Sequence, residues 1–73
     1  MGKHKSRIIN IRCNATDETR DPPVYYKAKT YSYKFPKDEL KYKLVQLAKA
    51  SYREENEIPD QVEITTTEST QQT

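Results

Sequence analysis

The chain has 73 residues, of which 33% are hydrophobic and 33% are charged, and its formal net charge is +2. This length allows one small domain, and the hydrophobic share lies below the roughly 45–50% of ordinary domains, so the core must be small. Apolar runs are too short to span a membrane, and a single cysteine cannot form an intrachain disulfide, so we expect a cytoplasmic protein without a membrane partner.

Residues 1–6 are polar and basic, and we expect them to form a flexible arm. From Arg7 to Cys13 apolar and polar residues alternate, which predicts a half-buried strand. Residues 14–23 are turn-forming or charged and end in two prolines. They predict a long loop, because proline cannot donate to a strand ladder.

The tyrosine-rich segment 24–35 predicts a second strand. Its apolar side chains change parity midway, with Tyr26 and Ala28 on one side and Tyr31 and Tyr33 on the other. A bulge or bend would allow both pairs to be covered. Alternatively, the far end of this strand presents its aromatic rings outward.

Residues 38–55 are rich in helix formers and predict a helix after Pro36. Residues 62–65 predict a short third strand, and residues 66–73 contain no apolar side chain, so we expect a disordered polar tail. The stripe of the helix that should face the core comprises Leu40, Leu44, Leu47, Ala48 and Ser51.

These elements predict an α+β fold in the order β-β-α-β, with one helix across one face of a small three-stranded sheet, in a single domain of residues 7–65. Burial of so small a core barely offsets the entropy lost when the chain is ordered. A homodimer contact or another partner would therefore add stability. The predicted core comprises Ile9, Ile11, Cys13, Tyr26, Ala28, Leu40, Leu44, Leu47, Ala48, Val62 and Ile64.

The charges are distributed unevenly along the chain. Residues 1–53 hold all 13 basic residues and five acidic ones, a net charge of +8, whereas residues 54–73 hold six acidic residues and no basic one. This asymmetry predicts a body that binds polyanions and an acidic C-terminal segment. The acidic segment could aid solubility, dock on a basic partner, or fold back on the basic face through Glu54, Glu55 and Glu57.

The lysine and tyrosine side chains of the second strand and the helix are the best functional candidates. Lysines pair with phosphates, and tyrosine rings offer stacking surfaces for bases. We therefore predict a non-enzymatic module that binds nucleic acid electrostatically through Lys27, Lys29, Tyr31, Tyr33, Lys34, Lys41 and Lys43. One alternative is a protein-interaction module, an adaptor or an inhibitor of a larger assembly, which uses the tyrosine-rich strand and the acidic segment. Another is that these tyrosines only build the sheet and these lysines only solvate it.

No catalytic group, metal site or cofactor is expected. His4 and Cys13 are the only soft metal ligands, and neither has a partner at ligand spacing. A catalytic Cys–His pair would require the N-terminal arm to hold His4 against Cys13. The only glycine is Gly2, which excludes a glycine-rich phosphate-binding loop within the chain.

Overall fold

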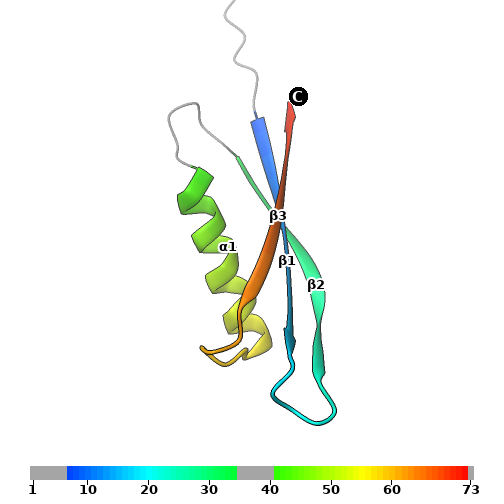
Figure 1. Ribbon diagram of the computed structural model, residues 1–73. Helices are drawn as coiled ribbons and strands as arrows, with labels where there is room; N and C mark the ends of the chain where they lie inside the picture. Colours follow the sequence, from blue (N-terminus) through cyan, green and yellow to red (C-terminus); the bar gives the residue numbers. More distant parts are fainter. Residues whose placement is uncertain (1–6, 35–40, 73) are drawn as a thin grey trace, which may run out of the picture.

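The computed structural model describes residues 7–34 and 41–72, and within them it contains three strands and one helix (Figure 1). The strands form an antiparallel sheet in the order β2-β1-β3, and the helix lies against one face of it. This arrangement confirms the predicted α+β class and the β-β-α-β order. The elements are β1 (Arg7–Asp17), β2 (Val24–Lys34), α1 (Lys41–Asn56) and β3 (Ile64–Gln72).

The central strand, β1, is longer than predicted. Ile9, Ile11 and Cys13 are buried, as expected, and Ala15 continues the same alternation. The strand ends at Asp17, whose buried carboxylate accepts hydrogen bonds from the backbone and hydroxyl of Thr19. The long loop predicted from residue 14 is therefore wrong for residues 14–17, because pairing with β3 as far as Ala15 and with β2 as far as Asp17 extends the strand through polar sequence.

Of the two alternatives for β2, the bulge is the one observed, and it lies at residues 27–28, slightly before the change of parity near residue 30. The register between β1 and β2 shifts where Cys13 pairs with Lys29 and Ala15 pairs with Tyr26, so that β2 has one extra residue. The shift turns Tyr26 on one side of the bulge and Tyr31 on the other toward the same core. The alternative, in which the far end of β2 presents its aromatic rings outward, is wrong.

Helix α1 packs on the sheet through a stripe that shares Leu44 and Ala48 with the predicted one but does not include Leu47. Ala48 and Tyr52 are fully buried, with Val45 partly buried beside them, whereas Leu47 is 51% exposed. The small Ala48 side chain allows the helix to approach the sheet closely. The Tyr52 hydroxyl donates to the backbone oxygen of Lys27 in the bulge, at 2.7 Å, so the buried phenol keeps a partner. Residues 38–40, which we expect in the first turn, lie outside the described residues.

The C-terminus of α1 has two stabilising features. The backbone N–H of Ile58 bonds to the carbonyl of Arg53 and that of Glu57 to the carbonyl of Glu54, which is the pattern of a Schellman cap. Glu57 adopts a left-handed φ of 52° at the position where glycine is usual. The Arg53 guanidinium donates to the backbone oxygens of Pro59 and Val62 and so joins the helix end to the loop before β3.

Strand β3 corrects the prediction of a disordered tail. It extends to Gln72 and pairs with β1 from Ile64 onward, whereas we expect disorder from residue 66. Threonine is β-branched and favours strands, and the ladder with β1 satisfies the backbone where no apolar side chain is available. Because β2 and β3 are each antiparallel to β1, they run parallel to one another, and α1 connects them across β1.

Candidate nucleic-acid interface

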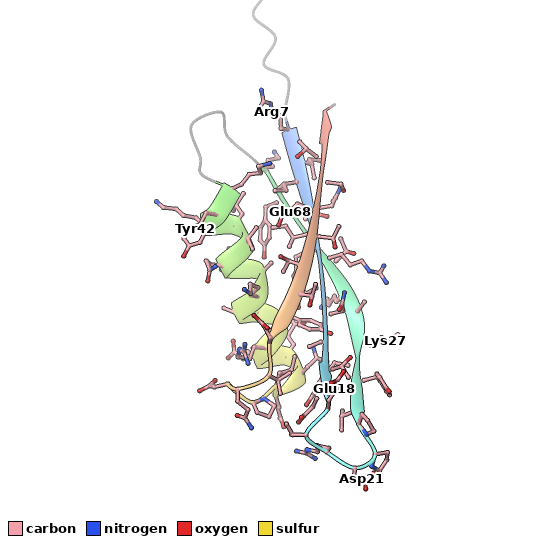
Figure 2. The ribbon with its side chains drawn as sticks, viewed as in Figure 1. Arg7, Glu18, Asp21, Lys27, Tyr42 and Glu68 are labelled. Atoms are coloured by element: carbon pink, nitrogen blue, oxygen red, sulfur yellow. The ribbon has the colours of Figure 1, made fainter. Side chains whose placement is uncertain are left out.

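The structure does not bring the seven predicted site residues onto one surface. Two of them, Lys27 and Lys34, lie on the sheet face away from α1, and Figure 2 shows Lys27 projecting from that side. Three others lie on the helix side of β2, and the remaining two are exposed on α1. The residues on the helix side are Lys29, Tyr31 and Tyr33, and those on α1 are Lys41 and Lys43.

Lys29 and Tyr31 are occupied by a contact with the helix. Glu55 accepts a hydrogen bond from the Tyr31 hydroxyl at 2.7 Å and forms an ion pair with Lys29 Nζ at 2.8 Å. These two donors lower the pKa of the Glu55 carboxyl, and burial followed by the Glu55 hydrogen bond raises the pKa of Tyr31. Lys29 and Tyr31 therefore already have an intramolecular partner at the surface. The ring of Tyr31 is unavailable as a stacking surface, because it packs against the core and Lys29 Nζ lies over it.

The acidic segment thus contacts the basic strand through Glu55. Glu54 and Glu57 are exposed, and no ion pair joins either to another described residue. Whether this contact competes with a polyanion stays a prediction. The contact itself links the C-terminal turns of α1 to the middle of β2.

The sheet face away from α1, which we call the open face, is polar and basic. The β1 residues on this face are the even-numbered ones, which alternate with the buried Ile9 and Ile11. Asn10 and Arg12 each pair with one residue of β2 and one residue of β3. Arg12 lies in the middle, flanked by Thr30 and Thr67. The open face comprises Ile8, Asn10, Arg12, Asn14 and Thr16 of β1, Tyr25, Lys27, Thr30, Ser32 and Lys34 of β2, and Thr65, Thr67 and Ser69 of β3.

The open face carries positively charged side chains, and no acidic residue of the three strands lies on it. Arg12, Lys27 and Lys34 are exposed and form no ion pair with the described residues. The acidic residues of the three strands, Asp17 and Glu68, have the opposite parity and lie on the covered side. Two exposed acids flank this face in sequence, Glu18 just after β1 and Glu63 just before β3.

Arg12 is the candidate residue that the sequence analysis misses. The alternation of residues 7–13 already separates Arg12 from the buried side chains, and a three-stranded sheet with one helix leaves that other face uncovered. Lysine and tyrosine counts instead favoured β2. The signal that would have found Arg12 is its position at the centre of the middle strand.

Cys13 and His4 are the residues on which a nucleophilic or metal site would depend. The Cys13 thiol is fully buried, and burial raises its pKa despite the nearby Lys49 ammonium, so the reactive thiolate is disfavoured. His4 lies outside the described residues. Within residues 7–34 and 41–72, no three His, Cys, Asp or Glu side chains gather as metal ligands.

The described part of the chain contains no helix that is long and apolar enough to cross a membrane. No protein-family model, curated protein or solved structure matches the chain. The open face and its charges are therefore the features from which a function can be inferred.

Proposed function

We propose that the chain is a small non-enzymatic module that binds nucleic acid electrostatically, and that the open face is the binding surface. The observation that supports this most is the exposed trio Arg12, Lys27 and Lys34 on a sheet face that no helix of the described residues covers. Cations without internal partners can neutralise phosphates without first breaking an ion pair. Lys29 and Tyr31 are left out of the surface, since Glu55 already binds both. The proposal keeps the cytoplasmic location expected from the single cysteine.

Binding of this kind depends strongly on salt, because phosphate neutralisation releases counterions. Three phosphate contacts give a log–log salt slope of about −3, so raising the salt from about 50 to 200 mM weakens binding roughly 40-fold. Basic residues of the N-terminal segment 1–6 would add to the slope. The proposal is wrong if the full chain binds neither single-stranded nor duplex oligonucleotides at about 50 mM salt.

Two charge-matched double variants locate the surface. Lys27→Ala with Lys34→Ala removes two charges from the open face, whereas Lys41→Ala with Lys43→Ala removes two from α1. We expect the first pair to reduce the magnitude of the salt slope by about two and the second to leave it nearly unchanged. Equal losses in both pairs would show that net charge, not the open face, drives binding. Fluorescence anisotropy over a salt series measures the slope.

A protein-interaction module remains the second candidate, and the sheet edges favour it. β2 and β3 are the outer strands, and neither pairs with a further strand among the described residues. An outer strand can accept an extended peptide or a second copy of the chain through backbone hydrogen bonds. The absence of oligonucleotide binding, together with a concentration-dependent mass in sedimentation, would favour this candidate in the form of a homodimer.

A further inference from the structure

We infer that the nucleic acid is B-form duplex DNA, and that the open face lies in its major groove with Arg12 near the groove centre. This inference depends on the proposed function and names the substrate class of the same surface. It rests on three observations: the position of Arg12, the side chains around it, and the location of the aromatic residues.

Arg12 projects from the middle of the open face because its neighbours are small. It pairs with Thr30 on one side and Thr67 on the other, and both are short, exposed residues. An arginine in this position can reach beyond its own row and bind a guanine edge or a phosphate with two parallel hydrogen bonds. The flanking Lys27 and Lys34 come from the outer strand β2 and would lie nearer the backbone phosphates.

The other open-face side chains suit base edges and sugar–phosphate contacts. Asn14, Thr30, Thr65, Thr67 and Ser69 carry amide or hydroxyl groups, which can both donate and accept hydrogen bonds. The three strand axes span about 10 Å, so in a major groove of about 12 Å the central strand and its side chains can enter while the outer strands lie over the two groove edges. The 11 residues of β1 extend for about 37 Å, close to one helical turn of DNA.

Single-stranded nucleic acid fits this face poorly. Sheet-based readers of single strands stack bases on exposed aromatic rings. Tyr31 and Tyr33 are half-buried against the core on the helix side, and burial raises the pKa of both. Tyr25, 75% exposed, is the aromatic residue that the described strands place on the open face, and it lies at one end of it. One ring at the margin provides no row of stacking positions.

Duplex RNA is disfavoured by groove shape. The major groove of A-form RNA is deep and narrow, so side chains on a flat sheet cannot reach its base edges. The wide minor groove could still contact the lysines, but Arg12 would lose the base edges that a duplex DNA major groove offers. We therefore expect residual electrostatic binding to duplex RNA.

The test compares three probes of one mixed sequence and about two helical turns: duplex DNA, single-stranded DNA and duplex RNA. Anisotropy at fixed salt should give about tenfold tighter binding to duplex DNA than to either other probe. Equal or tighter binding to single-stranded DNA or duplex RNA would overturn this inference and leave the proposed function intact. No binding to any probe would overturn both.

Arg12 variants test the placement independently. Arg12→Ala should weaken duplex binding by roughly 5- to 100-fold, and Arg12→Lys should keep the salt slope but lose most of the preference for duplex DNA. Lys43→Ala is the control, because Lys43 is exposed on α1, away from the open face, and it should leave both the affinity and the preference nearly unchanged. Full affinity in Arg12→Ala, or loss of the preference in Lys43→Ala, would contradict the placement. Circular dichroism of each variant confirms that it is folded.

Discussion

The two faces of this sheet come from the same three strands and differ in nearly every physical property. On the covered face, Ile9 and Ile11 of β1 contact a helix whose Ala48 and Tyr52 are fully buried. On the open face, Asn10, Arg12 and the other polar even-numbered residues of β1, together with their partners in β2 and β3, carry hydroxyl, amide and basic groups. The comparison separates two roles: we expect changes on the covered face to alter folding, and changes on the open face to alter binding.

The largest expected effect tests this separation with the same substitution on each face. Tyr52→Ala should destabilise the fold by about 3–5 kcal/mol, because it leaves a cavity and removes the donor to the Lys27 carbonyl. Tyr25→Ala on the open face should change stability by less than about 0.5 kcal/mol. Urea denaturation of both variants measures the difference. Similar losses for the two tyrosines would refute the division of roles.

A second pair compares two arginines. Arg53→Met removes the guanidinium that donates to the carbonyls of Pro59 and Val62, and we expect a loss of about 1.5–3 kcal/mol. Arg12→Met keeps a similar side-chain length on the open face, where no described carbonyl or carboxylate depends on it, and should be near neutral for stability. Thermal melts at several salt concentrations measure both. A neutral Arg53→Met would mean that the loop before β3 holds without the guanidinium.

The third prediction concerns pH. The folded-state pKa of Glu55 is lowered, so its contribution to stability is present above the unfolded pKa of about 4.3 and is lost as pH falls through the folded value. The pKa of Tyr31 is raised, so its contribution is present below about pH 10 and is lost as pH rises through the folded value. The contact is therefore strongest between these limits.

Glu55→Gln should accordingly flatten the loss of stability between about pH 5 and pH 2, as measured by the urea midpoint at each pH. Glu54→Gln is the matched control, since Glu54 is exposed and has no ion pair within the described residues. Asp17, whose pKa is lowered mainly by the Thr19 hydroxyl, contributes equally in all three proteins. Identical acid profiles for the two variants would show that the Glu55 contact adds nothing to folding.

The smallest expected effect is a gain. Glu57 has a left-handed φ of 52°, which costs a residue with a Cβ roughly 1–2 kcal/mol. Glu57→Gly should therefore stabilise the fold by about 0.5–1 kcal/mol, after the greater freedom of glycine in the unfolded chain is subtracted. Glu54→Gly, inside the helix, should destabilise by a similar amount. Oligonucleotide affinity should stay unchanged in Glu57→Gly, because the open face is on the other side of the sheet.

The sequence predicts the element types and their order well, because they follow from local patterns. Alternation in residues 7–13, the helix formers of 38–55 and the parity change in β2 each indicate the observed structure, including the bulge. Hydrophobicity alone misleads within the helix, where it selects Leu47 and omits Tyr52. The hydroxyl of Tyr52 has a hydrogen-bond partner because the bulge in β2 places the Lys27 carbonyl within its reach. No local sequence pattern around Tyr52 contains that information.

The candidate site shows the same limit. Counting lysines and tyrosines identifies β2 correctly as a source of cations, but it groups Lys27 and Lys34 with Tyr31, which lies on the other side of the sheet. The bulge reverses the parity of every later residue of β2, so a list of side chains cannot give their faces. Arg12 becomes a candidate only when β1 is known to be the central strand.

By itself, the sequence determined that this is a small α+β chain with a basic body, since composition and periodicity depend on neighbouring residues alone. Tertiary structure decided where that charge acts. Pairing with β1 orders the polar strand β3, and the contact with Glu55 occupies Lys29 and Tyr31. These outcomes depend on contacts between residues far apart in the chain, whose free energies no local pattern contains.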